Sequence, residues 1–228
     1  MDRARRLFVS PHLDDAVFAC GQWIASSRDP AVVTICAGRP PAGAPLTTWD
    51  AECGFLGGDD AIGLRRNEDR AALDLLGATP LWLDFRDDQY GEPGTPDAIG
   101  RALAGVIERE HASAVHFPLG LFHADHERAS DAALMLVDRF ASLAWHAYED
   151  AIYRRIAGAR DARMRVLGER GFALERCTVA LDGDAAMRKR DAVACYRSQL
   201  RALATRSAHD DVHAPEAHWI VSRDGGRQ

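Results

Sequence analysis

Near its amino terminus the chain reads Leu7-Phe8-Val9-Ser10-Pro11-His12-Leu13-Asp14-Asp15-Ala16-Val17-Phe18-Ala19-Cys20. Residues 7–9 form a short β-type run. A polar cluster at residues 10–15 follows this run and ends it. Beyond it, apolar residues continue to Trp23 and Ile24 at helical spacing. This order predicts a strand, then a loop that carries one imidazole and two carboxylates, and then a helix.

The same alternation of strand and helix continues along the chain. Further strands are expected at residues 31–37, 81–85, 114–119 and 145–148, and helices at residues 61–76, 96–107, 127–143 and 184–203. Strands that alternate with helices imply a parallel sheet with helices on both faces. We therefore expect an α/β fold, a single Rossmann-like doubly wound and mostly parallel sheet, in one domain that spans residues 1–228.

Charge and composition exclude several classes of protein. Lysine and arginine number 28 against 34 acidic residues, a net charge of −6, so no broad basic field exists to attract nucleic acid. No run of about 18 apolar residues predicts a membrane span, and the first residues do not form a signal peptide. Five cysteines without a C-x-x-C pair argue against disulfides and cysteine zinc sites. We expect a cytoplasmic protein.

Two loops hold most of the reactive side chains. They follow the first and the fourth strand, and their titratable residues are His12, Asp14, Asp15, His123, Asp125 and His126. In a doubly wound sheet, ligands bind beyond the carboxyl ends of the strands, at the point where the strand order reverses. We expect the two loops to meet there.

Two histidines and one carboxylate are the ligand set of a catalytic zinc site, and the same set binds iron(II) in non-haem enzymes. We take His12, Asp15 and His126 as the ligands. This choice leaves Asp14 as the general base toward a metal-bound water, the usual nucleophile of metal-dependent hydrolysis.

The two loops resemble the motifs of the PIG-L/LmbE-like family of metal-dependent N-deacetylases, whose first motif is (A/S)-H-P-D-D-E and whose second is H-x-D-H. The similarity extends to residues 65–68 and 76–77, an R-x-x-E helix that ends in Leu-Gly. It also reaches residues 148–153, similar to Y-E-D-x-P-Y, and residues 196–199, similar to Y-x-S-Q. Leu13, Ala16 and Ile152 depart from these patterns.

The resemblance implies roles for particular residues. It makes His12, Asp15 and His126 zinc ligands and Asp14 the general base. His123 would protonate the leaving amine or stabilise the oxyanion, Asp125 would orient a histidine, and Arg65 would face the polar groups of the substrate. The implied enzyme is a zinc-dependent amidohydrolase that removes an N-acetyl group from a small glycoconjugate of the N-acetylglucosamine (GlcNAc) type.

Two other functions remain open on the sequence. His12, Asp14, His126 and Arg139 also match the H-x-D…H…R pattern of iron(II), 2-oxoglutarate oxygenases, although those enzymes are built on an antiparallel jelly roll. The alanine at position 16, in place of a glutamate, also suits a sugar-binding relative without activity.

Several of these residues have an ordinary structural explanation as well. Aspartates before a helix cap it, and Arg65 with Glu68 has the spacing of a helix-surface ion pair. Glu149 and Asp150 are equally expected to cap a turn, and residues 196–199 to be structural. The remaining six histidines are expected to be satisfied in the core or at the surface. The glycine-rich segment 38–60, which contains Trp49, is our candidate for substrate specificity.

Overall fold

Seven strands form one sheet in the part of the chain that the structure, a computed structural model, describes: residues 5–205 and 209–225. They are β1 (Arg5–Ser10), β2 (Pro30–Thr34), β3 (Thr79–Trp82), β4 (Ala112–Pro118), β5 (Ala144–Tyr148), β6 (Phe172–Cys177) and β7 (His218–Arg223). The order in the sheet is β3-β2-β1-β4-β5-β7-β6, and the pairs from β3 to β5 are parallel. The expected doubly wound, mostly parallel sheet is confirmed.

The edge formed by β6 and β7 was not predicted. β7 runs antiparallel to both β5 and β6, and the helix that precedes β6 was not expected either. The two strands are half exposed and each carries one arginine, so they lack the continuous apolar run of a buried strand. Arg176 and Arg223 instead lie over the rings of Trp219 and Phe172, at 5.2 Å and 4.1 Å from the centroids.

Helices lie between successive strands, and three of the five predicted helices begin and end near the expected residues. Those of the described chain are α1 (Asp15–Ala25), α2 (Thr48–Cys53), α3 (Ala61–Leu76), α4 (Pro96–Arg109), α5 (Ala124–Leu134), α6 (Ala159–Glu169), α7 (Ala185–Val193) and α8 (Arg197–Ala204), with 3-10 turns η1 (Asp88–Tyr90) and η2 (His209–His213). Within the described residues, none of them is long and apolar enough to cross a membrane.

Two predicted helices are wrong in extent. The helix expected at residues 127–143 begins three residues earlier and ends at Leu134, and the next residues form turns in which the Phe140 carbonyl accepts the N–H of the Trp145 ring at 3.2 Å. The helix expected at residues 184–203 is broken between α7 and α8. The wholly buried Tyr196 lies at the break with non-helical backbone angles, and its hydroxyl donates to Asp69 at 2.8 Å.

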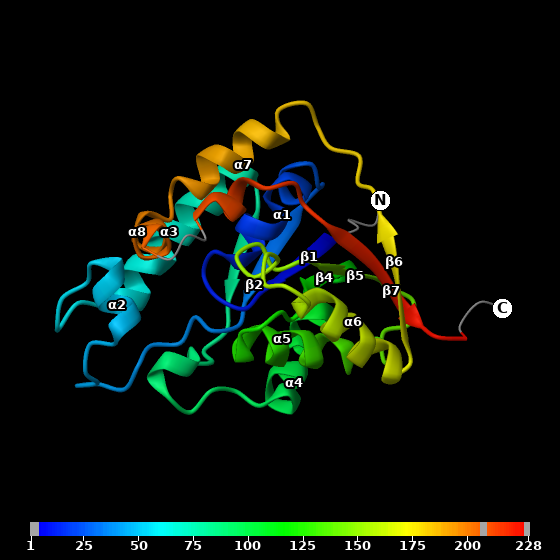
Figure 1. The fold of residues 1–228 in the computed structure, drawn as a ribbon, viewed down its shortest axis with the longest axis horizontal. Helices are drawn as coiled ribbons and strands as arrows, with labels where there is room; N and C mark the ends of the chain where they lie inside the picture. Colours follow the sequence, from blue (N-terminus) through cyan, green and yellow to red (C-terminus); the bar gives the residue numbers. More distant parts are fainter. Residues whose placement is uncertain (1–4, 206–208, 226–228) are drawn as a thin grey trace.

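Helices cover both faces of the sheet, as Figure 1 shows: α4, α5 and α6 lie on one side, and α1, α3 and α7 on the other. Successive side chains of a strand point to opposite faces, so each strand serves two cores. Leu7 and Val9 pack in one core, and Phe8 packs in the other. This double burial explains why the central strands are apolar without interruption.

Candidate metal centre

Two loops that follow neighbouring strands bring the predicted site residues together. After β1, the Ser10 hydroxyl donates to the His12 carbonyl at 2.6 Å and accepts the N–H of Ala16 at 3.0 Å, so the loop folds over the start of α1. After β4, the chain turns at Gly120, where φ is 86°, and His123 caps α5. Because β1 and β4 are paired, the loops meet at the switch point of the sheet, as expected.

The three predicted metal ligands form one cluster. One ligand atom from each of His12, Asp15 and His126 lies within 4.8 Å of the others. Asp15 Oδ2 is 3.1 Å from His12 Nδ1 and 3.2 Å from His126 Nε2. Neighbouring ligand atoms of a tetrahedral zinc ion lie roughly 3.3 Å apart, given zinc–ligand bonds of about 2.0–2.1 Å.

A buried nitrogen atom that makes no hydrogen bond among the described residues supports a metal ion at the same position. His126 Nε2 makes no hydrogen bond to any described residue, although the side chain is 1% exposed. Buried polar atoms rarely lack a partner, and an ion held between His126 and Asp15 would provide one. The residues of this chain therefore fit a metal ion.

Two further carboxylates contact the far nitrogens of these histidines. Asp150 Oδ1 is 2.5 Å from His126 Nδ1, and Asp125 Oδ2 is 3.2 Å from His12 Nε2. Carboxylates in this position fix which ring nitrogen faces a metal and increase its basicity. The sequence predicted such a contact for Asp125. For Asp150 it left two explanations open, and the structure shows that Asp150 also accepts the N–H of Gly120, at 3.0 Å.

The electrostatic field of the cluster favours positive charge. Burial opposes a charge on His12, but Asp87 and other nearby carboxylates raise its pKa well above the usual range. Burial also opposes a charge on His126, yet Asp15 is the main group that raises its pKa to about 9. The same field attracts a metal cation to the space between these side chains.

Asp14 and His123 are the predicted catalytic residues, and both line the cavity in front of the cluster. Burial, with Asp15 beside it, raises the pKa of Asp14 to about 8. Burial, with His12 beside it, lowers the pKa of His123. His123 Nδ1 accepts the N–H of Asp125 at 3.2 Å, so the neutral ring carries its proton on Nε2.

The cavity measures about 380 Å³, within the usual range for sites that bind small ligands. Its walls come from the loops after β1 and β4, segment 38–60, α3, the η1 turn with the residue before it, the turn after β5, and α8. The lining includes His12, Asp14, Asp15, Thr48, Trp49, Arg65, Asp87, His123, Tyr153 and Gln199.

Arg65 lines the cavity but is already paired. Its guanidinium donates to Asp50 Oδ1 at 2.7 Å, and the Tyr90 hydroxyl donates to the other oxygen of Asp50 at 2.8 Å. The alternative ion pair of Arg65 with Glu68 is wrong, because Arg65 is buried and Glu68 accepts the hydroxyl of Ser198 at 2.6 Å.

Segment 38–60 is a wall of the site. It contains α2, which packs against α8, and both Thr48 and Trp49 line the cavity. The Trp49 ring N–H donates to Gln199 Oε1 at 3.1 Å. Gln199, which the sequence treated as structural, therefore also belongs to the cavity wall.

Sequence reasoning missed two other lining residues, Asp87 and Tyr153. Asp87 follows β3, whose carboxyl end lies at the same edge of the sheet as those of β1 and β4. The rule that led to His12 would have found it. Tyr153 stacks on His123 with ring centroids 6.1 Å apart, and its only signal in the sequence was the Y-E-D-x-P-Y resemblance.

Residues outside the cluster correct two further expectations. Arg139, the arginine of the oxygenase pattern, pairs with Glu108 at the surface and does not line the cavity. His116, His146 and His218 surround Trp23 in the core, but their Nδ1 atoms lack hydrogen-bond partners among the described residues, so they are not fully satisfied.

Comparisons with known proteins agree with this geometry. The PIG-L family, described as GlcNAc-PI de-N-acetylase, matches residues 7–137, which include both loops. No curated protein matches the chain in sequence.

Solved structures match nearly the whole chain. The A40926 pseudoaglycone deacetylase is 28% identical, with a TM-score of 0.78, and the match covers 99% of this chain and 100% of that one. A triple mutant of a deacetylase from the teicoplanin biosynthetic pathway is 27% identical, with a TM-score of 0.79 and coverage of 98% and 100%. The zinc-inhibited form of teicoplanin deacetylase is 24% identical, with a TM-score of 0.77 and coverage of 98% and 100%.

The family match spans more than half of the chain and contains the histidine–aspartate cluster, and the two structures that are 27% and 28% identical to this chain are deacetylases. This chain belongs to the PIG-L family of de-N-acetylases.

Proposed function

We propose that the protein is a zinc-dependent hydrolase that removes an N-acetyl group from a small glycoconjugate of the GlcNAc type. The observation that carries this proposal is the cluster of His12, Asp15 and His126, in which His126 Nε2 is buried without a hydrogen-bond partner among the described residues. The family description, GlcNAc-PI de-N-acetylase, supports an N-acetylated sugar as the substrate. The names of the related deacetylases, one from the teicoplanin biosynthetic pathway and one that acts on A40926 pseudoaglycone, support removal of an acetyl group from a conjugate.

Zinc suits the cluster best. Two imidazoles and one carboxylate, each oriented by another group, are a common catalytic zinc set, and iron(II) is the alternative ion. The zinc-inhibited form of the teicoplanin deacetylase supports contact between zinc and a protein of this fold. A zinc ion bound here would polarise the acetyl carbonyl and make a water molecule more acidic.

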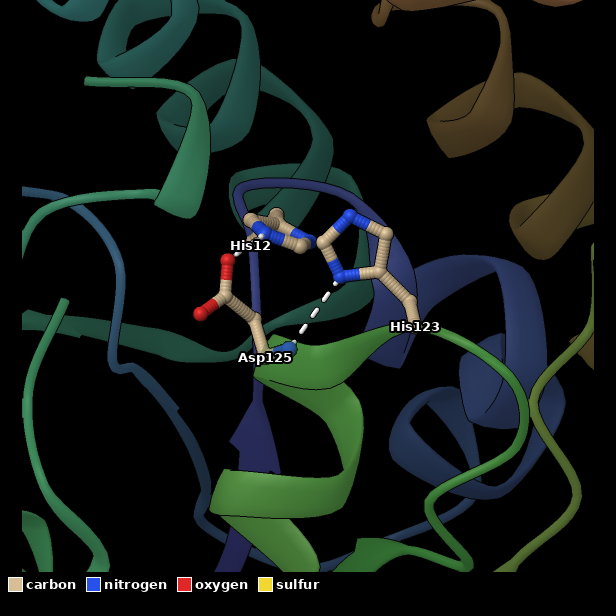
Figure 2. Close-up of side chains that lie close together, drawn as sticks. All are labelled: His12, His123 and Asp125. Atoms are coloured by element: carbon tan, nitrogen blue, oxygen red, sulfur yellow. Dashed lines mark hydrogen bonds and ion pairs between the residues drawn. The ribbon is translucent and has the colours of Figure 1, made fainter. Parts of the chain in front are cut away.

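Asp14 and His123 carry out different proton transfers in the proposed reaction. Asp14, which is 8% exposed and lines the cavity, accepts the proton of the attacking water. His123 Nε2–H donates to the carbonyl oxygen as negative charge develops there, or passes its proton to the departing nitrogen. Asp125 holds the imidazole ring of His12 in its orientation through the contact with Nε2 (Figure 2). The products are acetate and a free amine.

The walls of the cavity support a sugar as the bound group. Trp49 offers an aromatic face to the apolar side of a pyranose ring. Gln199 and Thr48 provide polar groups for sugar hydroxyls. Arg65 contributes a positive charge. Because its guanidinium is paired with Asp50, only the N–H groups that do not bond to Asp50 are available to contact the substrate.

We also propose that residues 1–228 form a single domain and that the protein works in the cytoplasm. The match of related structures over 98–99% of this chain supports one unit. All five cysteines are free thiols, which supports a reducing compartment.

Acetate release tests the function directly. Purified protein is incubated with N-acetylglucosamine conjugates, with and without prior removal of metal by a chelator, and both acetate and free amine are measured. We expect equal amounts of the two products, loss of activity on chelation and recovery with zinc. Tight sugar binding without any product would favour the non-catalytic relative instead.

Oxidation of a substrate with consumption of 2-oxoglutarate would favour the oxygenase. The parallel sheet and the surface position of Arg139 both argue against that outcome.

A further inference from the structure

Gln199 lies in the first turn of α8 and lines the cavity, with 5% of its surface exposed. A glutamine side chain can offer a substrate either its oxygen, which accepts a hydrogen bond, or its NH2 group, which donates one. The two ends of the amide have nearly the same shape, so the surrounding hydrogen bonds decide which end is available. These bonds therefore determine what kind of substrate group Gln199 can bind.

The hydrogen bonds begin at Glu68, a carboxylate of α3. Its two oxygens accept the backbone N–H of Ser198 at 3.0 Å and the Ser198 hydroxyl at 2.6 Å. An ionised carboxylate has no proton to give, so the hydroxyl must be the donor in this pair. The lone pairs of the hydroxyl then accept from Gln199 Nε2, which lies 3.1 Å away. Glu68 thus turns the nitrogen of Gln199 toward Ser198.

The opposite end of the amide is fixed by Trp49 of α2, whose indole nitrogen can only donate. Its N–H donates to Gln199 Oε1 at 3.1 Å. Gln199 Nε2 donates in addition to the Cys53 sulfur at 3.6 Å, so both of its hydrogens are used. An acceptor at one end and a donor at the other impose the same direction on the amide. Only Oε1, which has a second lone pair, can bond to a further group.

The first turn of α8 is held from α3. Tyr196, the residue before α8, makes no capping hydrogen bond with its side chain, and Glu68 supplies the acceptor for the Ser198 N–H instead. The next residue of α3, Asp69, accepts the Tyr196 hydroxyl at 2.8 Å. Two adjacent acids of one helix therefore fix where α8 begins, and with it the place of Gln199 in the cavity wall.

We propose that Gln199 selects substrates that present a hydrogen-bond donor beside Trp49, and that Glu68 is the positioning residue that gives Gln199 this selectivity. The inference rests on the proposed function and specifies one contact of its sugar. A sugar hydroxyl donates to Gln199 Oε1, whereas an ether or ester oxygen at the same place would set a second acceptor against it. The hydroxyl that meets α8 is therefore unsubstituted, and the rest of the conjugate is attached to the sugar through another atom.

Sugars that lack a single donor test the contact. Acetate release by wild type and Gln199→Leu is measured with the methyl glycoside of N-acetylglucosamine, its single-deoxy analogues and its single O-methyl ethers. For wild type, removal of one particular hydroxyl, and methylation of that same hydroxyl, should each lower kcat/KM about three- to tenfold, mainly through KM. Gln199→Leu should use these two analogues as well as it uses the parent sugar.

Glu68→Gln tests the positioning role, because it keeps the shape of the side chain and removes the charge. Its oxygen still accepts the Ser198 N–H, but its NH2 group donates to the Ser198 hydroxyl. That hydroxyl is then free to donate to Gln199 and reverse the amide. We expect the selectivity to be lost, as in Gln199→Leu. Asp74→Asn, at an exposed carboxylate of the same helix, is the matched control and should keep it.

The direction of the amide can also be measured without activity. The indole N–H of Trp49 gives an NMR signal that is identified by its loss in Trp49→Phe. This N–H should exchange with solvent about tenfold faster in Glu68→Gln and Ser198→Ala than in wild type, because it loses its acceptor. Asp74→Asn should match wild type. Circular dichroism establishes that the variants are folded, and a Glu68 that only stabilises the fold would leave both selectivity and exchange unchanged.

The outcomes distinguish the two proposals. A wild type that tolerates the loss of every hydroxyl, or a Gln199→Leu variant that keeps the selectivity, would overturn the contact. Unchanged selectivity and unchanged Trp49 exchange in Glu68→Gln would overturn the positioning role. Absence of acetate release from every sugar by the zinc-loaded wild type would instead contradict the proposed function. The affinities of the same sugars, measured from the shift of the Trp49 signal, would then still test the contact.

Discussion

Asp14 is the residue whose removal should separate chemistry from metal binding. It lies next to the ligand Asp15 but is not part of the cluster of proposed ligands. We expect Asp14→Asn to lower kcat by about 10²–10⁴-fold, because a general base contributes about this much, and to retain one zinc ion. Asp84→Asn, a change at an exposed carboxylate, should leave both quantities unchanged. Activity close to that of wild type in Asp14→Asn would remove this residue from the mechanism.

Asp150 should matter to the affinity of the metal rather than to the chemistry. It contacts the nitrogen of His126 that faces away from the proposed ion. Asn keeps an oxygen that accepts the N–H of Gly120 but loses the charge, so we expect Asp150→Asn to weaken zinc binding by about 10–100-fold. Competition with a chromogenic chelator measures the change. Asp138→Asn, at a surface ion pair with Arg223, is the control, and equal affinities in the two variants would refute the orienting role.

The proposed ligands could be identified from the sequence because they follow strands directly. His12 and Asp15 occupy a short loop fixed by the end of β1, and His126 opens the helix after β4. Asp150 could not be assigned in the same way. It is one of two adjacent acids after β5, and which acid turns inward depends on tertiary hydrogen bonds, such as the one that Asp150 accepts from the N–H of Gly120.

At the scale of single elements, α2 should set substrate affinity. Trp49 lies on α2, lines the cavity and donates to Gln199 of α8. We expect Trp49→Ala to raise KM by up to about tenfold with a smaller change in kcat, because stacking on an aromatic ring contributes about 0.5–1.5 kcal/mol. Trp49→Phe should restore most of the affinity. A change in kcat alone would show that α2 does not hold the substrate.

The elements themselves were predictable where they are buried on both faces. β1, β2 and β4 are apolar runs, and α3 ends at Gly77, as its left-handed backbone requires. β6 and β7 were not predicted, since their arginines pack on aromatic rings across the strands and give no periodic signal. The break before α8 was missed because a tertiary contact of Tyr196 overrides local helical preference.

At the scale of the whole molecule, the histidines around Trp23 should make stability depend on pH. Burial, with Arg6 and His218 nearby, lowers the pKa of His146 from 6.5 to about 4. Burial, with His146, Arg6 and His218 nearby, also lowers that of His116. The unfolded chain binds a proton at each histidine near pH 6.5, but the folded protein does not do so until lower pH. The stability present above pH 6.5 is therefore lost as the pH falls toward about 4.

The histidines of the proposed metal site titrate in the opposite direction, so a variant is needed to isolate this effect. Urea unfolding of wild type and His146→Gln at several pH values provides it. The free energy of unfolding of wild type, relative to that of His146→Gln, should decrease between pH 6.5 and about 4. A constant difference across this range would show that His146 takes up its proton equally in both states.

The central claim is that one metal ion at His12, Asp15 and His126 makes the protein a deacetylase. The most direct measurement is acetate release from an N-acetylglucosamine conjugate while zinc is added stepwise to metal-free protein. Activity should rise from zero in proportion to zinc until about one ion is bound per chain, and His126→Ala should stay inactive throughout. Full activity without metal, or in His126→Ala, would contradict the claim.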